Sequence, residues 1–502
     1  MKYSALAYHQ LSSYDRLKMD PHALDWEQEP AVYKDYPGKK VLDIPLEVKL
    51  EPVSLFKLFQ PQEIRAQNHP PSFETLGQLL LLAQMLTGRA RHANGEIWFR
   101  SIASAGALYP SELYIACSGI AGLAAGIYHY DVSKPALALI RSGNPMPVLD
   151  GDKASGTPML TFLISAIFFR SAWKYRDRAY RYHLLDSGHL LENLLLALRA
   201  FSFAYELNID FDDHQVNEIL GVDPRREGCL ALVKVPFSSP VSADTVEPLE
   251  SAEGLSRYSQ VAAREEMYDA LRIVHQESIK VMSGQECRAG DWVRYGLIDK
   301  NSWKSIASPV PANEVYRYPE VLLHRRSKRN FITGEPMSAA CLSAIISLVN
   351  DGFESCSLAA KGLSCGLLVD NVAEMEPGFY AVKSADRSLA LVTAGNFLGH
   401  MSHACLDQRW LAQAAIHVLL FADLVEVEKC AGARGYREVM LVAGRLGQRL
   451  YLGATVLGLG CCGIGAFYDR EASELIGMPD QVSLLYLLAV GQVKKSLHNK
   501  TK

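Results

Sequence analysis

Two stretches of the chain repeat each other, and this internal duplication constrains the fold more than any other feature of the sequence. Residues 180–221 align without a gap with residues 436–477, at a constant offset of 256 positions (436 − 180 = 256). The identical positions include glycines, aromatic residues and charged residues: Tyr180/Tyr436, Arg181/Arg437, Leu185/Leu441, Gly188/Gly444, Leu196/Leu452, Phe211/Phe467, Asp213/Asp469, Glu218/Glu474 and Gly221/Gly477. Self-similarity of this kind indicates tandem copies of one structural unit. We therefore expect two homologous halves.

The length of the chain supports the same organisation. A single hydrophobic core rarely grows beyond roughly 250–300 residues, and this chain has 502. We expect one domain over residues 1–240 and another over residues 313–502, joined by a linker at 241–312. The linker starts with a loop rich in Ser, Pro and acidic residues, and a polar helix is predicted from Ser256 to Met282. Such a long connection also allows a functional interpretation, as a lid over a site.

Helical and extended patterns mix within each half. The predicted helices are Phe73–Leu86, His189–Tyr205, Ala339–Val349 and Arg445–Leu457. The predicted strands are Leu113–Cys117, Ile127–Tyr130, Leu230–Val235, Gly378–Val382, Leu389–Thr393 and Leu484–Val490. Helices 189–205 and 445–457 are apolar around most of their circumference, so they should be covered on all sides, and they are candidates for packing against each other. Because strands and helices alternate without a strict rhythm, the pattern favours the α+β class over a doubly wound sheet.

Composition excludes several classes of protein. The net charge of −4 disfavours non-specific binding to nucleic acid. No uninterrupted apolar run reaches the roughly 20 residues that span a bilayer, and the first residues lack the apolar core of a signal peptide. Ten Cys residues show neither a CxxC pair nor zinc-ligand spacing. We expect a cytoplasmic protein without a metal, a membrane or a nucleic-acid partner.

Two motifs of the first half can serve a site. Residues 104–110 read SAGALYP, and the small residues Ser104, Ala105 and Gly106 would let a flat ring or a phosphate approach the backbone closely. The alternative is that this sequence forms an ordinary tight turn. Residues 170–182 read RSAWKYRDRAYRY, where Lys174 and Tyr175 would supply an acid/base pair beside a pocket. The alternative is a basic, aromatic surface helix or loop.

A basic motif opens the second half. Residues 325–329 read RRSKR, in which Arg325, Arg326 and Arg329 carry guanidinium groups and Ser327 carries a hydroxyl. Guanidinium groups bind phosphate oxygens in a bidentate fashion, and a serine adds a neutral donor, so the motif suits a phosphate monoester. The alternative is a solvated basic turn, which is the usual explanation of a charge cluster.

A glycine-rich motif follows the apolar helix of the second half. Residues 458–467 read GLGCCGIGAF, and their spacing is not that of a dinucleotide-binding turn. We expect a turn whose backbone N–H groups can donate to a ring nitrogen or a carbonyl. The adjacent Cys461 and Cys462 are either a redox pair or two small buried hydrophobic residues.

Taken together, these strings resemble the flavin-dependent nitroreductase superfamily, and within it the SagB/ThcOx-type dehydrogenases linked to azoline-to-azole oxidation. The resemblance covers most of both halves. Its most specific pieces are SAGALYP at 104–110, WKYRDRAYRYHLLDSGH at 173–189, RRSKRNF at 325–331 and GLGCCGIGAFYD at 458–469. Two α+β protomers of that superfamily, each a mainly antiparallel sheet flanked by helices, form a dimer with FMN at the interface. The resemblance implies such a dimer fused into one chain, an intramolecular pseudo-dimer, and leaves further oligomerisation open.

The resemblance also implies roles for the second-half motifs. Arg325 and Ser327, with Arg326 in the same element, would hold the phosphate and ribityl chain of FMN. Arg329 would lie beside the N1/O2 edge, where a fixed cation stabilises the negative charge of reduction. The glycine-rich turn would contribute Gly463, Ile464 and Gly465, with the Gly465 N–H directed at flavin N5.

In the first half the resemblance implies a wall and an acid/base pair. Ser104, Ala105 and Gly106 would lie along the flavin ring. Lys174 and Tyr175 match the pair that azoline oxidases use to remove a proton during ring oxidation.

Each half lacks elements that the other retains. The first half reads LFQPQEIR at 58–65 where RRSKR would stand, and AYELNIDF at 204–211 where the glycine-rich turn would stand. The second half reads SLAAKGL at 357–363 in the place of SAGALYP. We therefore expect one complete composite flavin site and one vestigial site in each chain.

The expected function is FMN-dependent transfer of a hydride between flavin N5 and a small-molecule or modified-peptide substrate, such as an azoline. Two alternatives remain. One is a nitro- or quinone reductase driven by NAD(P)H, for which NADPH would bleach the bound flavin. The other is a catalytically silent scaffold in a peptide-maturation complex, which would take up no FMN.

Overall fold

The computed structural model describes most of the chain in two compact units. The described residues are 4–19, 22–60, 65–92, 95–150, 159–237, 247–279, 290, 292–299, 302–306, 314–350, 359–383 and 387–494. Unit 1 comprises Met1–Leu11, His22–Val53 and Gln60–Ser283, and unit 2 comprises Ser12–Pro21, Ser54–Phe59 and Gly284–Lys502. Two short segments of the first half of the sequence thus belong to the unit that is otherwise built from the second half.

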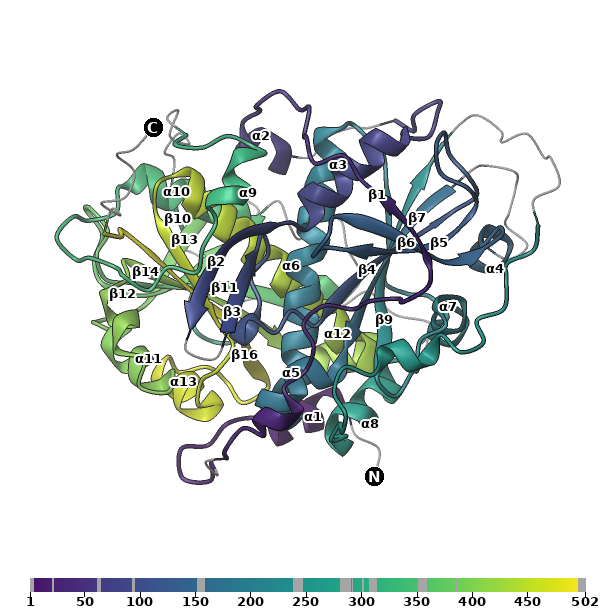
Figure 1. Ribbon diagram of the computed structural model, residues 1–502. Helices are drawn as coiled ribbons and strands as arrows, with labels where there is room; N and C mark the ends of the chain where they lie inside the picture. Colours follow the sequence, from purple (N-terminus) through teal and green to yellow (C-terminus); the bar gives the residue numbers. More distant parts are fainter. Residues whose placement is uncertain are drawn as a thin grey trace. The chain divides into compact units, whose positions relative to one another are not determined.

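Unit 1 is organised around an antiparallel seven-stranded sheet with the order β1-β6-β5-β4-β7-β9-β8 (Figure 1). A separate hairpin of β2 and β3 accompanies it. Its strands are β1 Lys40–Asp43, β2 Leu86–His92, β3 Gly95–Arg100, β4 Ser111–Cys117, β5 Gly126–Asp131, β6 Ala136–Ser142, β7 Met159–Ile167, β8 Glu206–Asn208 and β9 Glu227–Pro236. Its helices are α1 Ala5–Leu11, α3 Phe73–Ala83, α4 Met146–Asp150, α5 Phe168–Tyr175, α6 Ala179–Ala200, α7 Asp213–Leu220 and α8 Asp269–Ser278.

Unit 2 repeats this architecture with the sheet order β10-β13-β12-β11-β14-β16-β15, again antiparallel throughout. Its strands are β10 Lys304–Ser305, β11 Leu363–Val369, β12 Gly378–Lys383, β13 Ser388–Ala394, β14 Ile416–Asp423, β15 Gly460–Ile464 and β16 Val482–Gly491. Its helices are α2 Leu55–Phe59, α9 Glu320–His324, α10 Ala339–Asn350, α11 Leu398–Ala404, α12 Leu424–Val456 and α13 Asp469–Leu475.

The two units confirm the duplication and the α+β class. Position by position, the strand order of one sheet is that of the other. Local signals recur as well: α7 and α13 are each followed by a glycine with φ +67°, Gly221 and Gly477. A left-handed residue after a helix is a position where glycine avoids the steric cost of a Cβ atom, so the repeat retains its helix-ending residue.

The long apolar helices are buried as predicted. Every residue of α6 from Ala179 to Leu198 is buried, and α6 packs against α3, α5 and the strands β4, β7 and β9 of its own sheet. Helix α12 is buried almost throughout from Arg434 to Val456 and packs against α10 and the strands β14, β15 and β16. Covering such helices removes apolar surface from water on all sides, at roughly 25 cal/mol per Å². Within each unit the long helix is therefore a buried element packed against the sheet.

Several predicted boundaries are wrong. Helix α3 ends at Ala83 because Gln84 is extended, with φ −154° and ψ 118°, and leads into β2. Helix α6 begins at Ala179 and ends at Ala200, and Ser202 has φ +58°. Helix α12 begins at Leu424 rather than at residue 445. Strands predicted at 113–117, 127–130, 230–235, 378–382, 389–393 and 484–490 are confirmed.

The polar helix predicted from Ser256 to Met282 is also wrong. A 3-10 turn occupies Ser256–Ser259 and a helix occupies only Asp269–Ser278, while residues 280–282 lie outside the described residues. The carboxylate of Glu265 explains the break, because it accepts the backbone N–H of Val261 at 2.6 Å and that of Ala262 at 3.3 Å. These bonds hold the segment as a turn.

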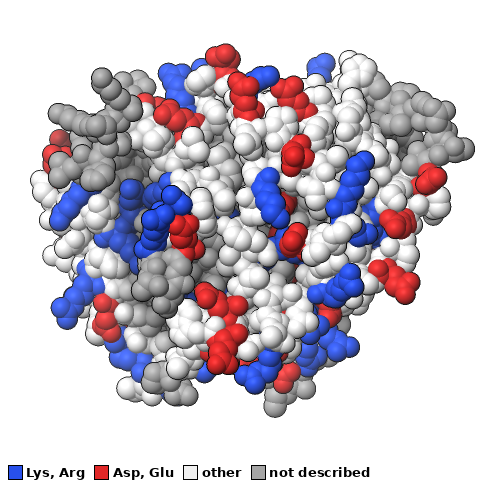
Figure 2. Space-filling model, in the orientation of Figure 1, with Lys and Arg blue, Asp and Glu red and all other residues white. Residues whose placement is uncertain are grey.

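Acidic and basic side chains are interspersed on the face shown in Figure 2, in keeping with the small net charge of −4. Among the described residues, none of the helices has both the length and the apolar character that crossing a bilayer requires.

Candidate functional site

The SAGALYP loop of unit 1 is anchored by a buried carboxylate, Asp186 of α6. Ser104 Oγ donates to Asp186 Oδ2 at 2.5 Å, and the Ala105 N–H donates to the same oxygen at 3.2 Å. Ser104 Oγ in turn accepts the backbone N–H of Tyr109 at 2.8 Å. Burial raises the pKa of Asp186 to about 7, and the bonds from Ser104 and Ala105 oppose that rise. The loop is therefore fixed at its beginning and at its end.

The same loop has an unusual backbone conformation. Gly106, Ala107 and Tyr109 have φ values of +67°, +57° and +45°. The left-handed region costs little for glycine and about 1–3 kcal/mol for a residue with a Cβ atom, so it persists only where surrounding contacts determine it. An ordinary tight turn, the alternative interpretation of this sequence, does not explain why Ala107 and Tyr109 both have positive φ.

Lys174 and Tyr175 lie against this loop. A Cβ atom built on Gly106 would stand 2.9 Å from Tyr175 Oη and 3.4 Å from Lys174 Nζ. The ammonium and the phenol therefore approach the loop where it has no side chain. Lys174 and Tyr175 are half-buried, and the Tyr175 ring lies 4.3 Å from that of Tyr182. The structure thus brings together the two first-half motifs that the sequence singled out.

A buried ion-pair system connects α5 to the loop. Arg170 of α5 donates through Nη1 to the carbonyl of Tyr109 at 2.9 Å and pairs with Glu112 Oε1 at 2.6 Å. His129 Nε2 lies 2.8 Å from the other oxygen of Glu112. Burial alone would raise the pKa of Glu112, but the charge of Arg170 and the bond with His129 lower it to about 2. Glu112 is therefore ionised at neutral pH, and it holds Arg170 against the loop.

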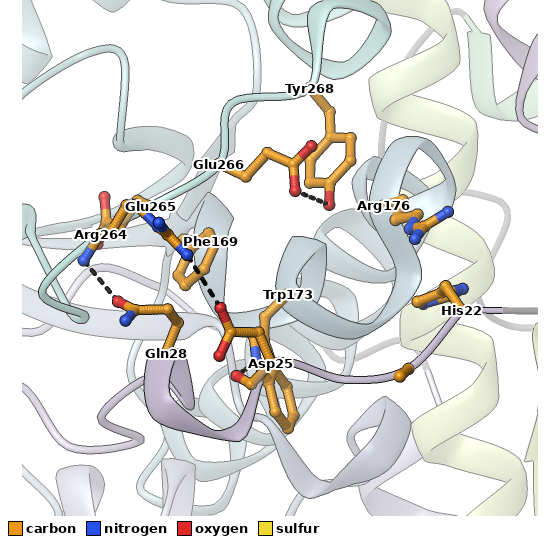
Figure 3. Close-up of a pocket in the computed structure, with 11 residues that line it drawn as sticks. His22, Asp25, Gln28, Phe169, Trp173, Arg176, Arg264, Glu265, Glu266 and Tyr268 are labelled. Atoms are coloured by element: carbon orange, nitrogen blue, oxygen red, sulfur yellow. Dashed lines mark hydrogen bonds and ion pairs between the residues drawn. The ribbon is translucent and has the colours of Figure 1, made fainter.

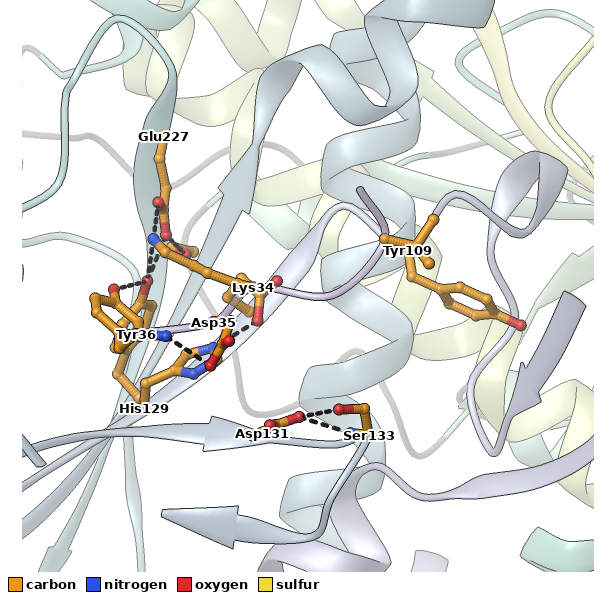
Figure 4. A network of polar contacts seen from close by, with 12 residues as sticks. Lys34, Asp35, Tyr36, Tyr109, His129, Asp131, Ser133 and Glu227 are labelled. Atoms are coloured by element: carbon orange, nitrogen blue, oxygen red, sulfur yellow. Dashed lines mark hydrogen bonds and ion pairs between the residues drawn. The ribbon is translucent and has the colours of Figure 1, made fainter. Parts of the chain in front are cut away.

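A second buried network braces the same sheet (Figure 4). The Lys34 ammonium contacts Glu227 and lies 2.7 Å from Tyr114 Oη. Glu227 Oε1 also accepts the hydroxyls of Tyr114 and Ser165, each at 2.7 Å. Burial works against the charged carboxylate, yet the ammonium of Lys34 keeps the pKa of Glu227 below its usual value. Fully bonded and inaccessible, this network is structural.

The basic motif of unit 2 lies along β15. Ser327 forms an isolated parallel bridge with Cys461, and the Lys328 N–H donates to the Cys461 carbonyl at 2.9 Å. Arg325 is buried, whereas Ser327 and Arg329 are exposed. The structure thus brings together the two second-half motifs, the basic segment and the glycine-rich one.

Tyr451 of α12, which sequence reasoning missed, joins these two segments. Its hydroxyl lies 3.0 Å from Ser327 Oγ and accepts the Gly463 N–H at 2.7 Å. The Arg325 guanidinium carbon lies 5.4 Å from the centre of the Tyr451 ring. Burial, together with the neighbouring thiols, raises the pKa of Tyr451 well above its usual value, so the hydroxyl stays protonated.

The glycine-rich turn predicted at 458–467 is wrong over Gly460–Ile464, which form strand β15. The backbone N–H of Gly463 is bonded to Tyr451 and is not presented to a ligand. A Cβ atom on Gly463 would lie 1.9 Å from Tyr486 Oη, so packing inside unit 2 already requires glycine there. Ile464 is buried and Gly465 half-buried at the end of the strand.

Cys461 and Cys462 are buried free thiols in the structure. Burial raises the pKa of both groups, against the opposing charges of Arg325 and Arg329. This environment suits the interpretation as two small hydrophobic residues, since reactive cysteines have lowered pKa values.

A model of the nitroreductase family matches the chain twice, over residues 66–235 and 322–492. The chain belongs to the nitroreductase family. Each match covers most of one sheet with its long helix, so the family's structural unit occurs in tandem.

Named relatives resemble single parts of this nitroreductase-family chain. A protein of Methanocaldococcus jannaschii that is provisionally named nitroreductase MJ1384 is 30% identical over 183 residues, which are 35% of this chain and 92% of that protein. The trifolitoxin-processing protein TfxB of Rhizobium leguminosarum bv. trifolii is 28% identical over 149 residues, 28% of this chain and 40% of TfxB.

One solved structure matches the whole tandem. It comes from Anabaena variabilis, is provisionally described as a nitroreductase, and aligns over 98% of this chain and 100% of its own with a TM-score of 0.76 at 24% identity. The comparison shows that the double fold as a whole also occurs in another protein.

The side chains of unit 2 fit the phosphate of FMN by their donor chemistry. Arg329 and Ser327 face solvent, and Arg326 of the same segment is half-buried. Guanidinium and hydroxyl groups are donors of the kind that a phosphate dianion requires. Arg326 Nη1 already donates to the carbonyls of Leu323 at 2.9 Å and Arg325 at 2.7 Å. Within the described ranges, no cluster of three or more His, Cys, Asp or Glu side chains is arranged to hold a metal ion.

The predicted vestigial elements fall partly outside the described residues. Residues 61–64 of the first half and 357–358 of the second half are not described. The counterpart of β15 in unit 1 is the short strand β8, Glu206–Asn208, which pairs with β9 and contains no glycine.

Proposed function

We propose that this nitroreductase-family chain is an FMN-dependent oxidoreductase that moves a hydride between flavin N5 and a small or peptide-borne substrate. The observation that carries the proposal is the approach of the Lys174 ammonium and the Tyr175 hydroxyl to Gly106. A titratable pair beside a fixed loop without a side chain is suited to proton transfer on a flat substrate. When bound, FMN supplies the two-electron chemistry that amino-acid side chains lack.

The roles of the binding residues follow from their chemistry. Arg325, Arg326 and Ser327 would hold the phosphate of FMN, and Arg329 would supply a positive charge near the pyrimidine edge of the ring. The small-residue loop of Ser104, Ala105 and Gly106 would lie along the ring. Ile464 and Gly465, where β15 ends, would line it as well. Gly463 would act only through the shape of β15, because its N–H is taken by Tyr451.

Lys174 and Tyr175 would move the proton that leaves the substrate as it is oxidised. Both side chains are half-buried, which leaves them reachable while limiting competition from water. TfxB is named as a protein that processes trifolitoxin, and this name supports a role in the maturation of another molecule. The proposal of an azoline-type peptide substrate rests on the resemblance of the motifs to the SagB/ThcOx-type dehydrogenases.

A reductase driven by NAD(P)H is the second candidate. The provisional name of MJ1384 favours this candidate, because the resemblance covers 92% of the length of MJ1384. Rapid bleaching of the flavin by NADPH would select this candidate, whereas a flavin indifferent to NADPH would select the dehydrogenase.

The amount of bound flavin tests the proposal. Each binding element occurs once in the chain, so reconstitution with FMN and removal of the excess should leave one FMN per chain. Arg325→Ala and Arg329→Ala should each weaken FMN binding at least tenfold, because a charge-assisted contact to phosphate is worth about 1.5–3 kcal/mol. Arg470→Ala, an exposed cation of α13, is the matched control. A ratio of two would contradict the single site, and no uptake would favour a scaffold.

Turnover tests the acid/base pair separately. Lys174→Ala should retain FMN but slow the oxidation of a thiazoline-containing test peptide by about 10²–10⁴-fold, the usual contribution of a positioned acid or base. Lys134→Ala, a surface lysine of unit 1, is the control. Unchanged turnover in Lys174→Ala would remove this residue from the reaction.

A further inference from the structure

A cavity of about 390 Å³ lies beside the candidate acid/base pair within unit 1 (Figure 3). Phe169 and Trp173 of α5 and Arg176, the residue after it, line the cavity, and His22, Glu266 and Tyr268 contribute from other segments. This volume is typical of a site for a small ligand or for one or two residues of a peptide. None of the roles proposed above uses this cavity.

Arg176 has a backbone conformation that suits glycine. Its φ and ψ are 49° and −131°, and the residue immediately follows Tyr175. At the constant offset of the duplication the equivalent residue is Gly432 (176 + 256 = 432), whose φ and ψ are 58° and −155°. The two halves thus share one sharp corner between helical segments. In unit 2 this corner is occupied by glycine, which adopts a positive φ without strain. In unit 1 it is occupied by Arg176, for which a positive φ is unfavourable.

The charge of Arg176 acts on its neighbours without a direct bond. It opposes the rise that burial causes in the pKa of Asp177, and it opposes the rise in the pKa of Tyr268 in the same way. Among the described residues its guanidinium makes no hydrogen bond or ion pair. The other charged side chains of the cavity do have partners: Arg264 with Asp25 at 3.2 Å, Glu265 with Arg226 at 2.8 Å, and Glu266 with the Tyr268 hydroxyl at 2.9 Å. An unpaired cation in a strained position is a feature that stability alone does not explain.

The cavity and the acid/base pair share one helix. Lys174 and Tyr175 approach Gly106, whereas Phe169, Trp173 and Arg176 line the cavity. His22 Nε2 lies 3.2 Å from the Lys174 carbonyl, and the Trp173 indole N–H donates to the Asp25 carbonyl at 2.8 Å. A ligand bound to Arg176 would therefore lie two residues along the chain from Lys174, close to the candidate acid/base pair.

We propose that this cavity binds a carboxylate of the peptide substrate, with Arg176 as its direct partner. Phe169 and Trp173 form an apolar floor for the adjoining side chain, and the Glu266 carboxylate accepts a peptide N–H. The carboxylate is either the C-terminus or an Asp or Glu side chain, since both have the same chemistry. This inference rests on the proposed function and names a subsite of its peptide substrate.

Fluorine NMR on 5-fluorotryptophan-labelled protein tests the subsite directly. The Trp173 resonance is assigned with Trp173→Phe, and three probes are titrated: acetyl-Gly-Gly-Phe with a free C-terminus, acetyl-Gly-Asp-Phe-amide, and the neutral acetyl-Gly-Asn-Phe-amide. At least one carboxylate probe should bind at least tenfold more tightly than the neutral probe. Comparing the first two probes distinguishes a C-terminus from a side chain.

Substitution of Arg176 then assigns the contact. Arg176→Gly should abolish the preference for the carboxylate, and it should fold because unit 2 accommodates glycine at the same corner. Arg176→Lys should keep a weakened preference, and Arg264→Gln, the paired cation of the cavity, should keep it in full. Equal binding of charged and neutral probes, or a preference that survives in Arg176→Gly, would overturn the subsite. The FMN content of each variant is measured in parallel, because a normal content with a failed subsite leaves the proposed function standing.

Discussion

Asp186 illustrates how one residue can connect a candidate site to stability. It is a buried residue of α6, and its carboxylate accepts hydrogen bonds from the first two residues of the SAGALYP loop. Enclosure disfavours the charged form, so its pKa rises from the ordinary 3.8 to about 7. The loop is thus attached to a group that changes its charge near neutral pH.

The free energy of unfolding should depend on pH because of the titration of Asp186. Because the folded pKa exceeds the unfolded one, the unfolded state releases its proton first, and the contribution of Asp186 to stability falls as pH rises from about 4 to about 7. Between pH 5 and pH 8, Asp186→Asn should therefore gain about 3 kcal/mol relative to the wild type, or about two pH units at 1.36 kcal/mol each. Thermal unfolding of both proteins at the two pH values measures this difference.

The exposed Asp480→Asn is a suitable control for that comparison. Parallel pH profiles for Asp186→Asn and the wild type would show that the buried carboxylate stays ionised throughout. Above pH 8 the two profiles should run parallel, because the titration is then complete.

Asp186 and Tyr451 also show what the sequence could not predict at this scale. Each is a polar residue on a buried helix that carries several other polar residues, so its position indicates a buried hydrogen bond without naming the partner. The partners, the loop at Ser104 and the strand at Gly463, are far away along the chain. Lys174, Tyr175, Arg325 and Ser327 lie in short motifs, which is why the sequence alone names them as candidates.

Among the elements, the corner between α5 and α6 and the kink within α12 are one feature seen twice. Both lie at the same position of the duplication and both have positive φ. The bend lets the chain leave the sheet on a short helix and continue in the long buried one. Sequence periodicity predicted the long helices but not the bend, because a lone Gly432 and a lone Arg176 share no side-chain signature.

A substitution at Gly432 should show how much free energy a Cβ atom costs at this bend. Gly432→Ala should lower the free energy of unfolding by about 1–3 kcal/mol, because a Cβ atom is disfavoured at φ 58°. Thermal unfolding measures the loss. Gly399→Ala in α11 is the control, since its Cβ atom meets no neighbour within 4 Å and alanine favours the helix. An unchanged melting temperature for Gly432→Ala would show that the corner relaxes at no cost.

Strand β15 shows how a glycine-rich segment can form a strand instead of a turn. Glycine lowers the intrinsic preference for a strand, so the local letters indicate a turn. Pairing with β16 on one side and the bridge to Ser327 on the other override that preference. Glycine is needed because Tyr486, Val493 and Lys328 approach the backbone closely. Such contacts join residues distant in sequence and leave no local pattern.

At the scale of the whole molecule, the two compact units do not follow the order of the sequence. Segment Ser12–Pro21 belongs to unit 2, where Arg16 pairs with Glu471 and Asp407 and lies 4.2 Å above the Tyr468 ring. Segment Ser54–Phe59 belongs to unit 2 as well, and its helix α2 packs on α12. The repeat predicted two copies of a fold. It gave no sign of this interleaving, because neither segment lies in the duplicated stretch.

The attachment of Arg16 to Glu471 has a consequence for how the protein is made. The two residues are 455 positions apart, so at 5–20 residues per second a ribosome needs roughly 20–90 s to progress from one to the other. Throughout that interval the early segment has been synthesised but its binding surface has not. Unit 2 can therefore close over the Arg16 segment only after Glu471 has been synthesised, long after that segment itself.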